Sequence, residues 1–230
     1  AADVVRVVEG VRGRVSMRME LRLRFDYGHI VPWVSRHGQL LSAIAGPDPV
    51  WLDIPVPVRG EHLSTVADFE VAAGDRIPFV LTYHPSHQSP PGRRDAPRGI
   101  EDTERFWTDW VAQGDYGGQW PEAVIRSLVL LKALTYAPTG GIVAAATTSL
   151  PEQLGGVRNW NYRYCWLRDA TFTLQALLGT GYVQEAEAWR DWLLRAVAGD
   201  PADLQIMYGI DGTRRLTEFQ LDWLGAYEGS

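Results

Sequence analysis

The chain has 230 residues, of which 46% are hydrophobic and 22% are charged, a balance typical of a globular protein with a substantial core. Its formal net charge of −6 argues against nucleic acid as the main partner, because phosphate binding requires a basic face. The single cysteine excludes an internal disulfide framework and favours the cytosol, and no apolar run is long enough to span a membrane. Ten tryptophans are a high number, for which a sugar-binding cleft is one common reason.

Residues 1–84 carry the pattern of antiparallel β-structure. From Ser16 to Phe25, apolar residues alternate with polar ones, which indicates a strand with one buried and one solvated face. Turn signals at residues 26–28 and 46–48 separate further strands, and Pro78 is expected at a strand start or a sheet edge. Several short strands at regular spacing predict a β-sandwich.

Residues 85–118 are expected to form a linker with one helix. The first part, up to Gly99, is rich in Pro, Gly, Ser and Arg, and the helix is predicted at 101–113 with acidic residues in its first turn. His84 and His87 are three residues apart, which resembles the spacing of a metal-ligand pair. No cluster of carboxylates or cysteines accompanies them, so we predict no metal site and no cofactor.

Residues 119–230 read as a series of helices. Pro121 is expected to begin a helix that runs to Leu134, and further helices are predicted at 170–178, closed by Gly179, and at 183–198. A β-hairpin is expected at residues 204–218, around an Asp-Gly turn. A β-rich first third followed by serial helices indicates two domains of different class.

The segment 158–169, with the sequence R-N-W-N-Y-R-Y-C-W-L-R-D, has an unusual composition. Four aromatic rings, three arginines, two asparagines and one carboxylate lie within twelve residues. A core segment would leave many of these polar groups without partners, and a solvated loop would not carry so many large rings. Rings stack on the apolar faces of a sugar or a base, while Asp and Arg bind hydroxyls. The composition therefore predicts the wall of a polar pocket.

Arg168 and Asp169 lie at the start of the helix predicted from residue 170. Adjacent residues do not face each other on a helix, so we expect no local salt bridge between them. A purely structural alternative is that Asp169 complements the helix dipole.

Two stretches together resemble glycoside hydrolase family 15, the family of glucoamylases, glucodextranases and bacterial or archaeal trehalases. They are A-P-T-G-G-I-V-A-A…T-S-L-P-E at residues 137–152 and the segment 158–170. The nearest resemblance is to the bacterial trehalase-like branch, and it extends over essentially the whole chain. It implies an antiparallel β-sandwich, truncated at its N-terminus, followed by the first helices of an (α/α)6 barrel from residue 119 to 230, truncated at its C-terminus.

The resemblance also implies roles for individual residues. Arg168 and Asp169 match the family positions that hydrogen-bond the hydroxyls of the terminal, non-reducing glucose, and Tyr162 and Trp166 match aromatic positions that line the same subsite. The implied ligand is an α-linked glucose disaccharide or oligosaccharide. The chain departs from the family at Asn161, where bacterial members usually carry an acidic residue.

The family inverts the anomeric centre with two glutamates, one acting as acid and one as base. Both are expected beyond Ser230, so we predict no catalytic residue in this chain and no activity of the piece alone. Glu218, Asp222 and Glu228 lie on a polar, helix-like stretch and are predicted to be solvated. Cys165 lies among rings without a basic neighbour, so we predict a buried structural residue and not a nucleophile.

Three functions remain open at this point. The leading hypothesis is an inverting, exo-acting α-glucoside hydrolase of trehalase or glucoamylase type. An enzyme of the same architecture that cleaves disaccharides with phosphate is a second possibility, and a non-catalytic sugar-binding protein is a third. The chain opens in a strand-like pattern and closes after a helix-like one, so we expect an internal piece of a longer protein.

Overall fold

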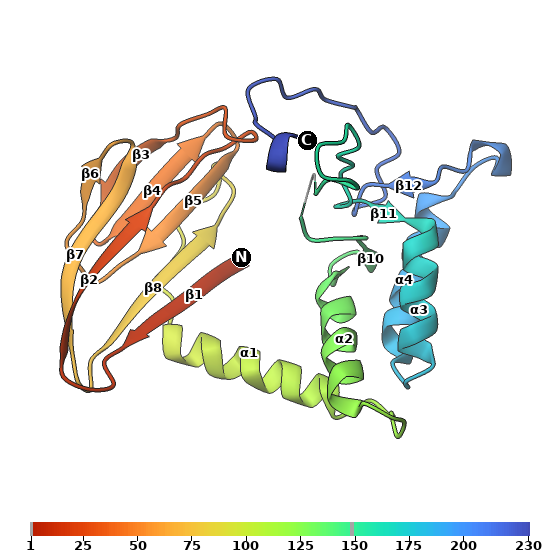
Figure 1. Cartoon of the computed structure of the whole chain (residues 1–230), viewed down its shortest axis with the longest axis horizontal. Coiled ribbons are helices and arrows are strands. Elements are labelled where there is room, and N and C mark those ends of the chain that lie inside the picture. Colours follow the sequence, from red (N-terminus) through yellow and green to blue (C-terminus); the bar gives the residue numbers. More distant parts are fainter. Residues whose placement is uncertain (1, 148–149) are drawn as a thin grey trace. The chain divides into compact units, whose positions relative to one another are not determined.

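The computed structural model describes residues 2–147 and 150–230 (Figure 1). Thr148 and Ser149, which belong to the polar T-S-L-P-E stretch, lie outside the described residues. The chain divides into two units, Ala1–Arg105 and Phe106–Ser230, and each has its own core. The boundary between the units falls within a helix.

The first unit consists of antiparallel sheets, which confirms the predicted β character of this region. Its described residues form a five-stranded sheet of order β1-β8-β5-β4-β3 and a three-stranded sheet of order β2-β7-β6. The two sheets are compatible with a β-sandwich. The strands are β1 (Ala2–Glu9), β2 (Arg14–Leu21), β3 (Trp33–His37), β4 (Leu40–Ala45), β5 (Asp48–Asp53), β6 (Arg59–Glu61), β7 (Ser64–Ala72) and β8 (Arg76–Tyr83).

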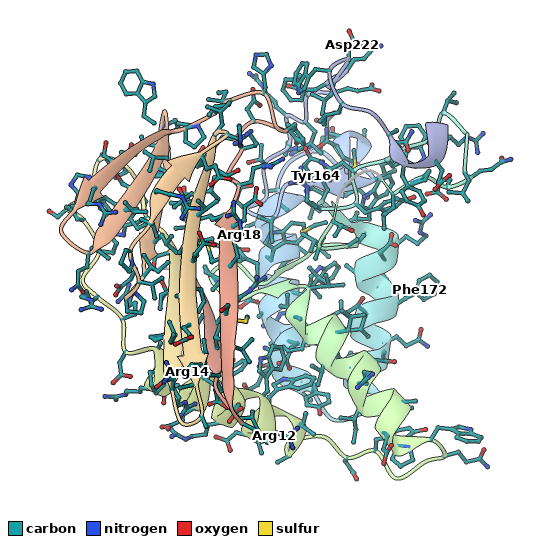
Figure 2. The ribbon with its side chains drawn as sticks, turned by 60° about the vertical axis from the view of Figure 1, so that its left-hand side comes forward. Arg12, Arg14, Arg18, Tyr164, Phe172 and Asp222 are labelled. Atoms are coloured by element: carbon teal, nitrogen blue, oxygen red, sulfur yellow. The ribbon has the colours of Figure 1, made fainter. Side chains whose placement is uncertain are left out.

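The core between the sheets lies at one end of β2. Leu41 and Leu52 of the larger sheet are buried, and Met19 and Leu21 of β2 pack against their cluster. Toward the other end of β2, Val15 is 52% exposed. The predicted buried face of this strand therefore exists only over its C-terminal half, because the buried cluster reaches only that half. The outer face of the smaller sheet carries arginines that pair with carboxylates on neighbouring strands, and Figure 2 shows two of them, Arg14 and Arg18, following β2. These ion pairs are solvent-exposed, so each contributes little to stability.

The predicted turns and the predicted position of Pro78 agree with the structure. Asp26, Tyr27 and Gly28 all have positive φ angles, and Gly46 has a φ of 65° between β4 and β5. Pro78 is near the start of β8. At this position β8 pairs with β1 only, because its pairing with β5 begins at Val80. A proline that cannot donate a ladder hydrogen bond is tolerated there.

The first helix begins earlier than the sequence pattern suggested. Helix α1 spans Ala96–Val111, so the predicted start at residue 101 was wrong, and its first turn has no acidic residue. Asp95 caps the helix, because its Oδ1 accepts a hydrogen bond of 3.1 Å from the backbone N–H of Arg98. Pro97 lies in the first turn, where its missing N–H costs nothing.

The second unit contains three further helices and two short antiparallel pairs among its described residues. The predicted helices are confirmed to within a few residues at each end, and Pro121 is the first residue of its helix. The elements are α2 (Pro121–Ala133), β9 (Thr135–Tyr136), β10 (Gly141–Ile142), β11 (Cys165–Trp166), α3 (Leu167–Leu178), α4 (Val183–Ala196), the 3-10 helix η1 (Pro201–Asp203), β12 (Met207–Tyr208) and the 3-10 helix η2 (Tyr227–Gly229).

One buried cluster of the second unit contains an ion pair. The ring of Trp110 stacks on the ring of Tyr182 with centroids 4.0 Å apart. The indole N–H of Trp110 and the ammonium of Lys132 both donate to Oε1 of Glu185, each at 2.8 Å. Burial acts to raise the pKa of Glu185, but these two hydrogen bonds, a backbone hydrogen bond and the charge of Lys132 together outweigh it, so the pKa lies below its ordinary value. The buried hydrophobic members are Trp110, Leu128, Leu177 and Tyr182.

A second buried cluster lies beneath the start of α3. Trp192 is 1% exposed, and its indole N–H donates to the carbonyl oxygen of Ile210 at 3.0 Å. Trp192 meets Tyr208 edge to face, with centroids 6.1 Å apart. The buried members are Ile142, Cys165, Ala170, Trp189, Trp192, Ala196 and Tyr208.

The hairpin predicted at residues 204–218 was wrong. A turn is present, because the N–H of Gly209 donates to the carbonyl of Thr213 at 2.8 Å. The strand before it, β12, pairs with β11 instead, in the register Cys165↔Tyr208 and Trp166↔Met207. After the turn, the guanidinium of Arg214 binds the carbonyl oxygens of Ala198 and Asp203 at 2.9 and 2.8 Å, which leads the chain away from β12.

Candidate functional site

The segment 158–169 crosses from an irregular loop into helix α3. Its backbone is held against residues 144–145, whose N–H groups donate to the carbonyl oxygens of Tyr164 and Tyr162 at 3.0 and 2.9 Å. Cys165 and Trp166 then form β11, and α3 begins at the next residue. Backbone hydrogen bonds to residues 144–145 and the pairing of β11 with β12 therefore fix the part of the segment that carries Tyr162 and Trp166.

The four residues predicted to bind sugar lie in one continuous cluster, here called the aromatic–arginine cluster: Tyr162, Trp166, Arg168 and Asp169. The rings of Tyr162 and Trp166 are 5.7 Å apart between centroids and inclined by 33°. The guanidinium carbon of Arg168 is 5.9 Å from the centre of the Trp166 ring. Nη2 of Arg168 is 3.1 Å from Oδ2 of Asp169. Apolar ring faces, a guanidinium and a carboxylate thus lie side by side.

The ion pair between Arg168 and Asp169 contradicts our expectation that adjacent residues would not pair. The rule about facing positions describes side chains that project straight from a helix. The long side chain of Arg168 is 66% exposed, so it is free to bend toward its neighbour. Asp169 also lies in the first turn of α3, where its charge complements the helix dipole.

Trp166 presents carbon and not nitrogen to its surroundings. Its indole Nε1 is buried and has no hydrogen-bond partner among the described residues, although the side chain as a whole is only half-buried. The exposed part of the ring is therefore its apolar surface. Such a surface stacks against the C–H groups of a pyranose ring.

Glu152 joins the cluster, and the sequence analysis did not single it out as a site residue. The hydroxyl of Tyr162 donates a hydrogen bond to Oε1 of Glu152. That hydrogen bond raises the pKa of Tyr162, and partial burial and the charge of Glu152 act in the same direction. The only sequence signal was the position of Glu152 at the end of the T-S-L-P-E stretch.

Asn161, where the resemblance leads us to expect an acidic residue, has a local role. Its Oδ1 accepts hydrogen bonds from the backbone N–H and from Nε of Arg163, at 3.0 and 3.1 Å. A carboxylate in this position would accept the same two bonds with the added strength of charge. Asn161 therefore makes the same two hydrogen bonds to Arg163 but lacks the negative charge of an acidic residue.

Cys165 is unsuited to nucleophilic chemistry. Its side chain is fully buried, and burial raises the pKa of the thiol to about 12. At neutral pH it is a small apolar group of the core. This agrees with the prediction of a structural residue.

The three acidic residues near the end of the chain are all exposed: Glu218, Asp222 and Glu228. The helix-like stretch predicted for them is absent at residues 214–221, which have neither helix nor strand, and only Glu228 lies in the short η2. Figure 2 shows Asp222 pointing away from the ribbon. Their solvated surroundings agree with the sequence-based interpretation.

Within the described residues, no group of three or more His, Cys, Asp or Glu side chains could hold a metal ion. Of the two histidines with metal-like spacing, His84 contacts the carbonyl oxygen of Ser89 through Nε2, at 2.7 Å. None of the helices in the described ranges is long and apolar enough to cross a membrane.

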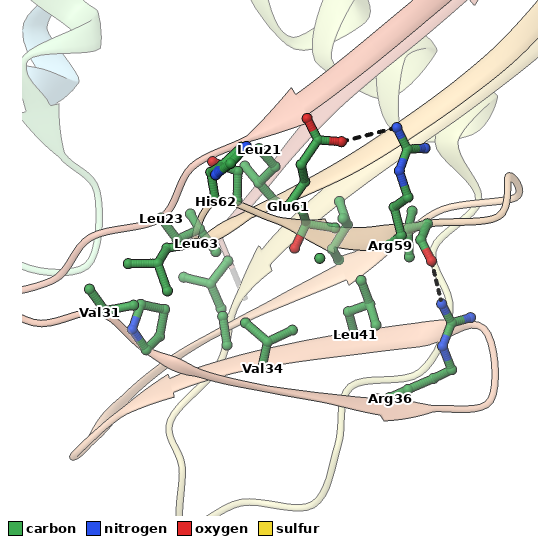
Figure 3. Close-up of a pocket in the computed structure, with 18 residues that line it drawn as sticks. Leu21, Leu23, Val31, Val34, Arg36, Leu41, Arg59, Glu61, His62 and Leu63 are labelled. Atoms are coloured by element: carbon green, nitrogen blue, oxygen red, sulfur yellow. Dashed lines mark hydrogen bonds and ion pairs between the residues drawn. The ribbon is translucent and has the colours of Figure 1, made fainter.

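A pocket of about 550 Å³ lies in the first unit, between the two sheets. Figure 3 shows Val34 and Leu41 on one side of it and Leu21 on the other, with the ion pair of Arg59 and Glu61 nearby. Nine of its eighteen lining residues are Leu or Val, and six are polar or charged: Arg36, Arg59, Glu61, His62, Ser64 and Thr65. No residue of the aromatic–arginine cluster lines this pocket or a smaller one of about 170 Å³ in the same unit. The sugar-binding roles of the cluster stay a prediction.

The comparisons with known proteins identify the class. The model of glycosyl hydrolases family 15 matches residues 119–230, which include α2, α3, α4 and the whole aromatic–arginine cluster. The resemblance seen in the motifs is thereby confirmed over this segment.

The relatives found are trehalases. The chain is 33% identical to a trehalase of Mycolicibacterium smegmatis, over 99% of the chain and 36% of the relative. It is 30% identical to a trehalase of Thermoplasma acidophilum, over 99% of the chain and 39% of the relative. Over 47% of the chain and 19% of the relative, it is 39% identical to trehalase 2 of Sulfolobus acidocaldarius. The chain thus spans a little over a third of the length of the first two. No solved structure gives a significant match.

Proposed function

We propose that the protein to which this chain belongs is an inverting, exo-acting α-glucoside hydrolase that releases glucose, with trehalose as its substrate. The observation that carries the proposal is the gathering of Tyr162, Trp166, Arg168 and Asp169 in one cluster at the start of α3. The trehalases related to the chain over 99% of its length support the choice of substrate.

In this proposal the cluster binds the terminal glucose unit. The rings of Trp166 and Tyr162 stack on the apolar face of the pyranose. Asp169 accepts hydrogen bonds from sugar hydroxyls, and Arg168 donates to their oxygen atoms. A sugar with a misplaced hydroxyl leaves one of these groups desolvated and unpaired, which is the physical basis of selectivity.

The acid and the base come from other parts of the protein. An inverting mechanism needs two carboxyl groups about 6.5–9.5 Å apart, one to protonate the leaving oxygen and one to activate water. The acidic residues near the end of this chain, Glu218, Asp222 and Glu228, are all exposed. The 230-residue chain alone is therefore expected to bind sugar weakly and to be inactive.

The proposal includes the architecture and the compartment. Residues 1–84 form a β-sandwich, residues 85–118 a linker with a helix, and residues 119–230 the start of an (α/α)6 barrel. The family match from residue 119 and the serial helices α2, α3 and α4 support this division. The cytosol is the proposed location, on the ground that the chain has a single, buried cysteine.

The test is glucose release by the full-length protein from trehalose, maltose and isomaltose, followed by NMR of the anomeric protons. Inversion of trehalose releases one α-glucose and one β-glucose per cleavage, and we expect equal amounts at early times. Release of α-glucose alone would mean retention. Formation of glucose 1-phosphate only when phosphate is added would favour the phosphate-dependent alternative, and binding without release would favour a sugar-binding protein.

A further inference from the structure

We propose that Glu152 is a positioning residue for sugar binding, which holds the hydroxyl of Tyr162 so that its oxygen faces the substrate as a hydrogen-bond acceptor. This inference rests on the proposed function, because it states which group donates the hydrogen bond in one contact of the same sugar-binding subsite. The contact that carries it is the hydrogen bond from the Tyr162 hydroxyl to Oε1 of Glu152.

Both partners of this hydrogen bond are anchored through their backbones. The N–H of Glu152 donates to the carbonyl of Arg158 at 3.1 Å, which closes the loop between them. The carbonyl of Tyr162 accepts from the N–H of Ala145 at 2.9 Å. The side-chain contact therefore joins two fixed points and not two mobile tails.

The hydrogen bond determines what Tyr162 offers to a ligand. A tyrosine hydroxyl has one hydrogen and can act as donor or acceptor, whereas an ionised carboxylate only accepts. With Glu152 as its partner, Tyr162 commits its hydrogen to the carboxylate and leaves a lone pair for a second partner. A sugar hydroxyl that meets Tyr162 must then act as the donor. The raised pKa of Tyr162 is consistent with a hydrogen held by an anion.

Glu152 also fixes the plane of the ring. The face of Tyr162 is held by Trp166, at 5.7 Å between centroids and an inclination of 33°, and its hydroxyl end is held by Glu152. Two contacts at different points prevent rotation of the ring. Removal of Glu152 frees the hydroxyl to rotate and the ring to tilt, so substrate affinity falls while the acid and the base are untouched.

The experiment compares Glu152→Ala, Glu152→Gln and Tyr162→Phe in the full-length protein, with Glu187→Ala, at an exposed position on α4, as the matched control. We expect Glu152→Ala to raise KM for trehalose about tenfold, the effect of one lost hydrogen bond to a charged group, with a smaller change in kcat. Glu152→Gln keeps an acceptor oxygen and should restore most of the affinity. Glu187→Ala should leave both constants unchanged.

A double-mutant cycle separates action through Tyr162 from a general structural role. If Glu152 acts through the hydroxyl, Glu152→Ala added to Tyr162→Phe raises KM no further. Full additivity would overturn the inference, as would an unchanged KM in Glu152→Ala. If the alanine variant does not fold, the same cycle is run with Glu152→Leu.

A spectroscopic titration keeps this inference distinct from the proposed function. The ultraviolet absorbance of phenolate, taken as the difference between wild type and Tyr162→Phe, reports the ionisation of Tyr162 alone. We expect Glu152→Ala to move this ionisation to lower pH. If wild type releases no glucose but the shift occurs, the hydrolase proposal fails while the contact stands. If glucose is released and the ionisation does not shift, Glu152 does not hold the hydroxyl and the inference fails.

Discussion

The buried carboxylate of Glu185 provides the sharpest test of how the helical unit is held together. Its side chain is 6% exposed, and the same oxygen atom accepts hydrogen bonds from Trp110 and Lys132. Glu185→Ala would leave the indole N–H of Trp110 without a partner in the core. It would also leave the ammonium of Lys132, which is 20% exposed, without its counter-ion.

The expected loss of stability follows from these two consequences. Breaking a buried ion pair by removing one partner costs about 3–5 kcal/mol, and an unsatisfied buried donor costs about 1–3 kcal/mol. The two costs partly count the same lost contacts, and Lys132 can extend toward water. We therefore expect the free energy of unfolding of the local unit to fall by about 3 kcal/mol. In Glu185→Gln combined with Lys132→Met, the amide oxygen still accepts from Trp110 and no buried charge remains. That double variant should lose about 1 kcal/mol or less.

Hydrogen exchange in the full-length protein measures this unit without requiring the whole chain to unfold in two states. For peptides of α2 and α4, a loss of about 3 kcal/mol makes exchange about 100-fold faster when opening is fast and reversible. Peptides of β4 in the first unit serve as the internal control. A less than threefold change in Glu185→Ala, or equal effects of Glu185→Ala and the double variant, would refute the assigned role of the ion pair.

Three further predictions concern pH, substrate binding and the thiol. Because the pKa of Glu185 is lowered on folding, its contribution to stability is fully present above its unfolded value of about 4.3 and is lost as the pH falls through the lower folded value; acid unfolding followed by circular dichroism should lose this dependence in Glu185→Gln. Asp169→Asn keeps the shape of the side chain and weakens a charge-assisted hydrogen bond. We expect a loss of about 1.5–3 kcal/mol of transition-state stabilisation, so kcat/KM for trehalose should fall about 10- to 150-fold. Unchanged kinetics would remove Asp169 from the site. Cys165, with its thiol pKa raised to about 12, should resist iodoacetamide at pH 8 in the native protein and react after unfolding in urea, as read by mass spectrometry of its peptide; rapid native labelling would contradict its burial.

Local patterns predicted the elements that depend on local chemistry. Pro121 opened its helix as expected, and the antiparallel character of the first unit followed from alternation along strands such as β2. Helix α1 was misjudged because Pro97 and Gly99 resemble linker residues. The capping carboxylate of Asp95 and the tolerance of a first turn for proline were the overlooked signals.

The candidate site was predicted in part for a similar reason. Composition and family motifs singled out Tyr162, Trp166, Arg168 and Asp169, which all lie within eight residues of one another. Glu152 was missed because its role depends on a loop that returns to Tyr162, and no local pattern encodes that closure. The failed hairpin has the same origin, since β12 pairs with β11, which lies far earlier in the chain: Tyr208 pairs with Cys165 and Met207 with Trp166.

The pairing that replaced the hairpin is also what positions the site. Side chains alternate across a strand, so in the two-residue β11 one side chain enters the core while the next points to the opposite side. Cys165 is fully buried beside Trp192 and Tyr208, and Trp166 faces Tyr162 and Arg168. Since β12 fixes the register of β11, a slip of one residue would exchange the two side chains and bury the indole ring. The core around Tyr208 therefore keeps the ring of Trp166 on the side of Tyr162 and Arg168, although none of its own atoms belongs to the cluster.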